Sequence, residues 1–149
     1  KKAMDVNFMG VVNVLAQAVP DMMRREAGQI AIISSVAGYR GLPKAAAYGS
    51  TKAALINLAE SLHPELAAKG VTLSIVNPGF IDTPMTEVND FPMPFLMPVD
   101  AAAERLLAGL ERKNYEITFP RRFTWMMKLL RLLPNAVYFW IVRTFILRT

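Results

Sequence analysis

The chain has 149 residues, the size of one domain, and its 53% hydrophobic content is ample for a buried core. It contains no cysteine and one histidine, which excludes disulfides and thiolate ligands, and we expect no metal site. Residues 1–119 carry 11 basic and 12 acidic side chains, whereas residues 120–149 carry six basic side chains and no acidic one. The net charge of +5 therefore belongs to the C-terminal part, and we expect no nucleic-acid partner for the protein.

Hydrophobic periodicity predicts helices and strands that alternate along the chain. A helix is expected over residues 3–26, with Gly28 as its C-terminal cap, followed by a β-branched strand over residues 29–34. A helix over residues 45–69, kinked or broken at Pro64, precedes a strand over residues 71–77. The last expected elements are a short helix over 83–89, an apolar loop over 90–98, a helix capped by Asp100 that runs to 112, and a strand over 115–119. This order predicts an α/β fold with parallel βαβ units, whose ligands collect at the carboxyl ends of the strands.

Residues 120–149 form a basic, apolar tail that contains Trp125 and Trp140. Its longest run without charge, residues 132–142, is well short of the roughly 20 residues needed to span a bilayer. A basic segment rich in Trp, Phe and Leu is typical of a helix that lies on a membrane surface. The alternative is an arm that folds over the substrate pocket or a neighbouring subunit. Both arrangements bury one apolar face, so both remain open.

Tyr48 and Lys52 carry the chemistry that the sequence suggests. Their spacing of four residues places both side chains on one face of the helix predicted over residues 45–69. A neighbouring ammonium group favours the phenolate form of a tyrosine, which suits Tyr48 to general acid–base catalysis. Ser35, at the end of a predicted strand, could hydrogen-bond the same substrate oxygen. This trio suits proton exchange with an alcohol or carbonyl while a hydride moves elsewhere, although the tyrosine–lysine spacing alone is common in ordinary helices.

Four segments, in this order, resemble motifs of the short-chain dehydrogenase/reductase family. They are DVNFMG at 5–10, IISSVAG at 32–38, AYGSTKAA at 47–54 and VNPGFIDTP at 76–84. The resemblance implies a three-layer Rossmann-type, doubly wound parallel sheet. The family's glycine-rich turn and its NNAG motif do not occur in this sequence. We therefore expect residues 1–119 to be the C-terminal part of an NAD(P)-binding Rossmann-fold catalytic domain, the second half of the fold, and residues 120–149 to be a helical tail.

The resemblance implies four catalytic residues. Tyr48 would be the general acid or base, and Lys52 would support it and also hold the nicotinamide ribose hydroxyls. Ser35 would orient and polarise the substrate oxygen, with Ser34 as the competing choice. Asn7 would kink the first helix and hold a water linked to Lys52, which gives a proton path to solvent. The alternative for Asn7 is an ordinary polar residue on a helix surface.

The resemblance also implies a set of cofactor-binding residues. Pro78 and Gly79 would end a strand and let the backbone approach the cofactor closely, and Ile81 and Thr83 would contact the nicotinamide carboxamide. The alternative for the last two is ordinary loop structure. The complete expected set is Tyr48, Lys52, Pro78, Gly79, Ile81 and Thr83. The cofactor would be NAD or NADP, with a preference for NADP, and the residues that discriminate between them would lie upstream.

We expect an NAD(P)-dependent oxidoreductase (EC 1.1.1.-) that interconverts a carbonyl and a secondary alcohol. A hydrophobic or lipid-like substrate, and a role in lipid metabolism, are suggested by a group of apolar side chains: Phe80, Phe91, Met93, Phe95, Leu96 and Met97. These could instead pack on a partner subunit. The resemblance implies a homo-oligomer, and we expect a cytoplasmic protein with a possible peripheral membrane contact through residues 120–149. The 149 residues alone would be inactive. The alternative function is a non-catalytic fragment or membrane-surface binding module.

Overall fold

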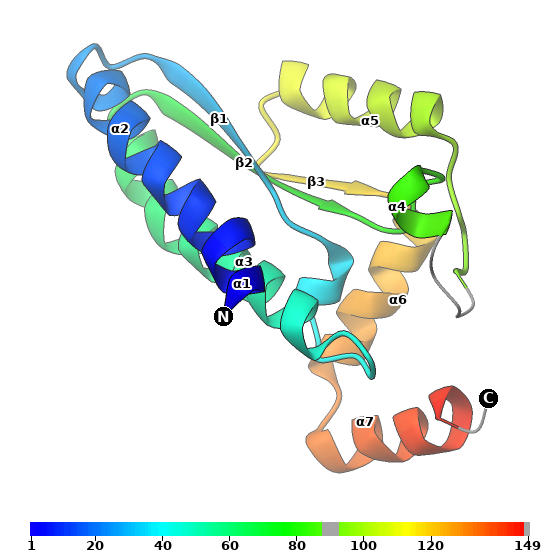
Figure 1. Cartoon of the computed structure of the whole chain (residues 1–149). Coiled ribbons are helices and arrows are strands. Elements are labelled where there is room, and N and C mark those ends of the chain that lie inside the picture. Colours follow the sequence, from blue (N-terminus) through cyan, green and yellow to red (C-terminus); the bar gives the residue numbers. More distant parts are fainter. Residues whose placement is uncertain (88–92, 148–149) are drawn as a thin grey trace.

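The computed structural model describes residues 1–87 and 93–147 and contains a three-stranded parallel sheet (Figure 1). The strands are β1 (Gly28–Ile33), β2 (Val71–Pro78) and β3 (Glu116–Phe119), and they lie side by side in that order. Helix α3 (Ala46–Ala67) connects β1 to β2, and helix α5 (Val99–Glu111) leads from the loop after β2 to β3. The predicted βαβ alternation is therefore confirmed.

Helices cover the sheet on two faces because the side chains of β2 alternate between two cores. Leu73 and Ile75 join a core that also contains Leu15 of helix α2 (Gly10–Arg24) and Leu55 of α3. Val76 joins a second core, formed with residues of α5 and β3. Figure 1 shows the sheet between α2 and α3 on one side and α5 on the other. This arrangement confirms the three-layer α/β fold expected from the sequence.

The remaining helical elements are mostly short. They are α1 (Lys2–Met4), the π-helical turn η1 (Asp5–Met9), the 3-10 turn η2 (Val36–Gly38), α4 (Pro84–Glu87), α6 (Arg121–Leu132), α7 (Asn135–Ile141) and the π-helical turn η3 (Val142–Ile146). Because α1, η1 and α2 follow one another without a gap, they form the helix predicted over residues 3–26. Of the helix predicted over 83–89, the structure describes α4. Residues 88–92, which include Phe91 of the apolar loop, lie outside the described residues.

Two local predictions are wrong, and one of two alternatives for a third is not realised. The left-handed residue after α2 is Glu26, whereas Gly28 begins β1, where a Cβ would lie 2.7 Å from the Met22 sulfur. Helix α3 continues through Pro64 to its end at Ala67, so the alternative of a break there is not realised. Pro64 lacks an N–H, so it removes a single helical hydrogen bond, and α3 continues for only three residues beyond it. Asp100 does not cap α5, because the helix begins one residue earlier and the cap position belongs to Pro98.

The C-terminal helix α6 packs on the sheet. Its Phe123 and Met127 are buried in the same core as Leu55 of α3. Helix α7 is attached to the loop before α3, because the Tyr138 hydroxyl donates a hydrogen bond to the carbonyl of Gly41. One face of the tail thus packs against this chain itself. Within residues 1–87 and 93–147, no helix combines the length and apolarity that crossing a bilayer requires.

Candidate active site

Ser34 and Ser35 follow β1 but have different environments. The Ser34 side chain is buried, and its hydroxyl donates to the carbonyl of Lys52 at 2.8 Å. Ser35 is half-buried, and its hydroxyl accepts from the Ala37 N–H at 3.1 Å and donates to the Pro78 carbonyl at 3.4 Å. Ser35 therefore lies where β1 and β2 both end, whereas the Ser34 hydroxyl fastens the strand to α3.

Two glycines allow the turn after Ser35 to touch the start of α3. A Cβ on Gly38 would lie 2.8 Å from the backbone carbon of Lys52, and a Cβ on Gly49 would lie 3.1 Å from the carbonyl oxygen of Ala37. Real Cβ atoms do not approach backbone that closely without something shifting. Because Gly38 and Gly49 have no side chain, the first turns of α3 can pack directly against η2. This contact brings the tyrosine–lysine segment next to Ser35.

Tyr48 and Lys52 share one face of α3, as their spacing predicts. The Lys52 Nζ lies 5.5 Å from the centre of the Tyr48 ring and donates to the Ile33 carbonyl at 3.0 Å. The Tyr48 side chain is 43% exposed, so it is accessible to a bound molecule. Burial lowers the pKa of the Lys52 ammonium below its ordinary value, because desolvation disfavours the charged form.

Asn7 is linked to this pair through Thr51, a residue that the sequence reading did not select. The Asn7 amide donates to the Thr51 hydroxyl at 3.3 Å, and the Thr51 hydroxyl donates to the Tyr48 carbonyl at 2.7 Å. Thr51 is fully buried, and Asn7 lies in the π-helical turn η1, where the helix departs from regular geometry. The only available signal was the position of Thr51 between Tyr48 and Lys52. The water link from Asn7 to Lys52 stays a prediction.

Pro78 and Gly79 lie at the end of β2, beside Ser35. The Gly79 N–H donates to the Phe119 carbonyl at 2.7 Å, which extends the pairing with β3. A Cβ on Gly79 would lie 2.8 Å from the Phe123 ring, so α6 occupies the space that a side chain would need. The absent side chain at Gly79 thus accommodates the C-terminal helix. Its close approach to a cofactor stays a prediction.

Ile81 and Thr83 belong to a turn that Thr86 organises. The Thr86 hydroxyl donates to the Ile81 carbonyl at 2.6 Å and accepts from the Thr83 N–H at 3.0 Å. Ile81 also pairs with Met97, which joins the turn to the far end of the apolar loop. The sequence reading missed Thr86, although threonine near a helix start commonly bonds backbone groups in this way. Contact of Ile81 and Thr83 with nicotinamide stays a prediction.

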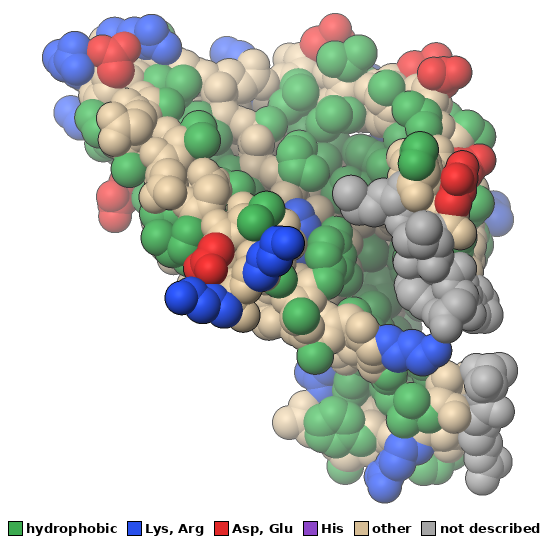
Figure 2. All heavy atoms as spheres, in the orientation of Figure 1, with side chains coloured by type: hydrophobic (Ala, Val, Ile, Leu, Met, Phe, Trp, Pro, Cys, Tyr) green, Lys and Arg blue, Asp and Glu red, His purple; other side chains and the backbone are tan. Residues whose placement is uncertain are grey.

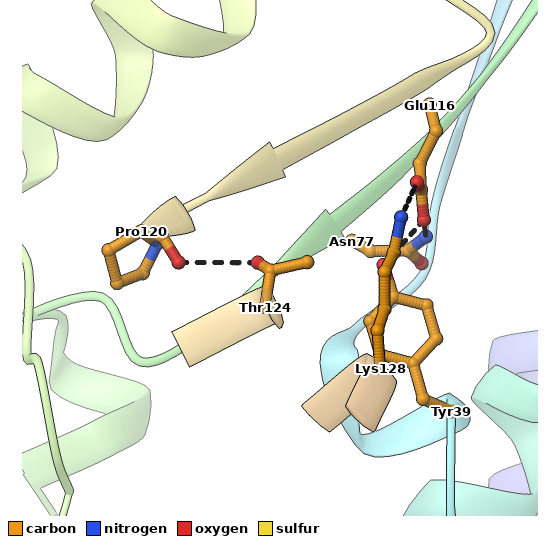
Figure 3. A network of polar contacts seen from close by, with 6 residues as sticks. All are labelled: Tyr39, Asn77, Glu116, Pro120, Thr124 and Lys128. Carbon is orange, nitrogen blue, oxygen red and sulfur yellow. Dashed lines mark hydrogen bonds and ion pairs between the residues drawn. The ribbon is translucent and has the colours of Figure 1, made fainter. Parts of the chain in front are cut away.

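A polar network behind the site connects three elements (Figure 3). Glu116 of β3 accepts from the Tyr39 hydroxyl at 2.5 Å and from the Asn77 amide at 3.2 Å, and it pairs with Lys128 of α6. Burial opposes ionisation of Glu116, but the hydrogen bonds from Lys128, Tyr39 and Asn77 outweigh it and hold the carboxyl pKa below its ordinary value. Burial, and then the bond to Glu116, raises the pKa of the Tyr39 hydroxyl.

This network fixes the turn that follows Ser35, because Tyr39 lies immediately after η2. Figure 3 also shows the Thr124 hydroxyl, which donates to the Pro120 carbonyl at 3.2 Å in the first turn of α6. The network borders a hollow of about 430 Å³ between α3, β3 and α6. In the sequence, Asn77 stands out as a polar residue within an apolar strand. Its partners could not be identified from the sequence, because they come from distant parts of the chain.

Comparison with known proteins agrees with this geometry. The family model for short chain dehydrogenases matches residues 1–91. An uncharacterised oxidoreductase of Myxococcus xanthus is 37% identical over 134 residues, which cover 90% of this chain and 53% of that protein. A 3-oxoacyl-(acyl-carrier-protein) reductase of Staphylococcus aureus is 45% identical over 83 residues, covering 56% of this chain and 34% of that protein. The chain thus spans about half the length, or less, of these relatives.

A solved structure extends the similarity into the C-terminal helices. The short chain dehydrogenase of Burkholderia cenocepacia in complex with NADP superimposes with a TM-score of 0.78 at 26% identity, covering 93% of this chain and 57% of that one. The family model alone matches more than half of the chain, and it includes Asn7, Ser35, Tyr48 and Lys52. The chain therefore belongs to the short-chain dehydrogenase family.

Proposed function

We propose that the whole protein containing this chain is an NAD(P)-dependent oxidoreductase that interconverts a carbonyl and a secondary alcohol. The observation that carries the proposal is the position of Tyr48 and Lys52 on one face of α3, held by Gly38 and Gly49 against the turn after Ser35. These side chains gather at the carboxyl ends of parallel strands, where ligands of such sheets bind.

In the proposed reaction this chain supplies the proton chemistry. Tyr48 gives a proton to the substrate oxygen during reduction and takes it back during oxidation. The Lys52 ammonium stabilises the phenolate, and the Ser35 hydroxyl hydrogen-bonds the same oxygen. A bound dinucleotide would supply the hydride. The residues fit such a group, because the hydrogen bond from Lys52 to the Ile33 carbonyl uses one of the three donor hydrogens of its ammonium, which can also donate to ribose hydroxyls.

NADP is the proposed cofactor. Its support is the presence of NADP in the complex of the Burkholderia cenocepacia protein. None of the four motifs by which this chain resembles the family discriminates between NAD and NADP.

The proposed substrate is hydrophobic or lipid-like. Phe95 and Leu96 are exposed on the loop that follows the candidate site, and the Phe80 ring stacks on Phe123 at 5.5 Å between ring centres. An exposed apolar lining of this kind suits an apolar substrate. The Staphylococcus aureus relative, named as a reductase of 3-oxoacyl groups on acyl carrier protein, agrees with this choice.

The whole protein, rather than these residues alone, is proposed to be active. The chain spans about half of the Myxococcus xanthus relative. Ala31 and Ile33 of β1 are exposed on the sheet face opposite the first core, and this exposure supports the proposal that a further segment covers them. The alternative proposal, a non-catalytic role, predicts no turnover by the whole protein.

The test is an assay of the whole protein with NADPH and NADH against ketones and 3-oxoacyl thioesters of increasing alkyl length. We expect NADPH oxidation with kcat/KM rising with chain length. Activity with short polar ketones only would contradict the substrate class, and no oxidation of either nucleotide with any compound would favour the non-catalytic alternative.

A further inference from the structure

Helix α6 is apolar on two opposite faces. Its inner face places Phe123 and Met127 in the core. Its outer face carries Trp125, Met126, Leu129 and Leu132, which recur at helical spacing and are all exposed. The exposed fractions reach 70% for Trp125 and 80% for Leu132. Large apolar side chains that cluster in exposed positions are typical of an interaction surface.

Helix α7 and the turn η3, which follow α6 in the chain, carry further exposed apolar side chains. We use the name C-terminal apolar surface for the exposed residues Trp125, Met126, Leu129, Leu132, Val137, Phe139, Trp140 and Phe145. Half of the large hydrophobic side chains that are exposed in the described chain lie within residues 125–147. Such clustering marks an interaction surface rather than scattered exposure. Arg40 holds α7 in place, because it donates to Asn135 at 2.6 Å and lies 4.4 Å from the Tyr138 ring centre.

The charge around this surface has one sign. Arg121, Arg122, Arg131 and Arg143 are exposed, and residues 120–147 contain no aspartate or glutamate. The Lys128 ammonium pairs with Glu116, so we do not count it in the excess positive charge of this surface. Figure 2 shows the lobe formed by α7 with hydrophobic and basic side chains and no acidic ones on the visible face. Exposed arginines around Trp and Phe side chains match the headgroup region of an anionic bilayer.

We propose that the C-terminal apolar surface docks the protein on an anionic lipid membrane. The apolar side chains would enter the boundary between headgroups and acyl chains, and the four exposed arginines would contact lipid phosphates and carboxylates. A closed dimer through the same surface is less favourable, because a two-fold contact places the patch against its own copy, and residues 120–147 offer no acidic side chain to the arginines of the other copy. The proposed contact is peripheral; none of the helices among the described residues combines the length and the apolarity that crossing a bilayer requires.

Helix α7, which carries part of this surface, is bonded to the loop beside the candidate active site. The Tyr138 hydroxyl bonds Gly41, in the loop that leads from Ser35 to Tyr48. Docking would therefore hold that loop near the bilayer. If the substrate is hydrophobic, as the proposed function holds, docking places the candidate site close to substrate dissolved in the membrane; this step rests on the proposed function. Docking itself requires no catalysis, so a binding assay tests it separately from the proposed function.

The experiment is co-sedimentation of the whole protein with vesicles of phosphatidylcholine containing phosphatidylserine, or of phosphatidylcholine alone. Deleting residues 120–149 is unsuitable, because it would remove Phe123 and Met127 from the core. The test variant is Leu132→Glu, and the matched control is Leu107→Glu on α5, where the leucine is 59% exposed. A second test variant, Arg143→Glu, keeps the apolar side chains intact; the Arg143 Nε donates to the Phe139 carbonyl, four residues earlier in the chain.

We expect wild type and Leu107→Glu to sediment with the phosphatidylserine vesicles, and Leu132→Glu and Arg143→Glu to lose about tenfold in affinity each. Binding should fall with added salt and be weak on phosphatidylcholine alone. Light scattering reports the oligomeric state of each variant. Absence of wild-type binding, an equal loss for Leu107→Glu, or a Leu132→Glu change from dimer to monomer without wild-type vesicle binding would each overturn the proposal.

Discussion

Ser34 and Ser35 are adjacent in the chain, yet their hydroxyls have different surroundings. The Ser34 hydroxyl is buried and donates a hydrogen bond to the Lys52 carbonyl, so it helps to position α3. The Ser35 hydroxyl lies at the half-buried end of the sheet, where it reaches the Pro78 carbonyl. The sequence motif alone allows either serine to contact the substrate, because both follow the same strand. The structure separates a serine that fastens the fold from one that remains accessible.

Exchanging each serine for alanine should separate the two roles. In the whole protein, we expect Ser35→Ala to lower kcat/KM by about 10²-fold, since it removes a donor to the substrate oxygen, and to cost about 1 kcal/mol of stability through its bonds to Ala37 and Pro78. Ser34→Ala should cost about 1 kcal/mol of unfolding free energy with little change in kcat/KM, because it removes only the buried bond to the Lys52 carbonyl. Steady-state kinetics and urea unfolding measure the two effects. An inactive Ser34→Ala together with a fully active Ser35→Ala would contradict these assignments.

Among the elements, the contact between η2 and α3 positions the candidate site. Gly38 and Gly49 let the backbones meet, and Thr51 ties the same stretch of α3 to Asn7. The site is therefore built from three segments that are far apart in sequence: η1, the turn after β1, and the first turns of α3. Small changes in the η2–α3 contact should affect stability and activity together, because the backbone of Lys52 itself forms part of it.

A methyl group at Gly38 tests this contact. A Cβ there would lie 2.8 Å from the Lys52 backbone, so Gly38→Ala should destabilise the protein by about 1–3 kcal/mol and lower kcat. The matched control is Gly41→Ala, in the same loop, where nothing lies within 4 Å of the new Cβ. Tm and kcat of the two variants give the comparison. Equal Tm values for both variants would show that the close approach is not required.

The network around Glu116 joins β3, α6 and the turn after η2, and it should make stability depend on pH. Hydrogen bonds hold the pKa of Glu116 in the folded protein below its ordinary value, despite burial, so its ionised form stabilises the fold above that ordinary value. This contribution is lost as pH falls through the folded-state pKa. We expect the difference in unfolding free energy between wild type and Glu116→Gln to be largest near neutral pH and to shrink in acid.

The exposed Glu104 on α5 provides the control, because Glu104→Gln should change stability little at any pH. Urea unfolding at a series of pH values measures all three proteins. A Glu116→Gln difference that stays constant from neutral to acid pH would mean that the carboxylate charge does not stabilise the contact between α6 and the sheet.

At the scale of the whole molecule, the sequence predicted features that depend on residues close in the chain better than contacts between distant residues. The periods of apolar residues predicted the strands and long helices, and the spacing of Tyr48 and Lys52 predicted a shared face, because both depend on residues close in sequence. The prediction that Gly28 caps the first helix is wrong. Tight packing against Met22, rather than backbone conformation, explains why this position holds a glycine. The partners of Glu116 and the contact of Gly79 with Phe123 depend on tertiary packing, which periodicity does not encode.

The central claim for the whole molecule is that Tyr48 exchanges a proton with the substrate oxygen. The most direct test is the Tyr48→Phe variant of the whole protein, compared with wild type and with Tyr115→Phe, which removes a buried hydroxyl that has no hydrogen-bond partner in residues 1–87 and 93–147. We expect Tyr48→Phe to lower kcat by about 10²–10⁴-fold while NADPH affinity, measured by fluorescence titration, stays nearly unchanged. Tyr115→Phe should retain wild-type kcat. Near-normal turnover by Tyr48→Phe would contradict the assignment of Tyr48 as the acid–base group.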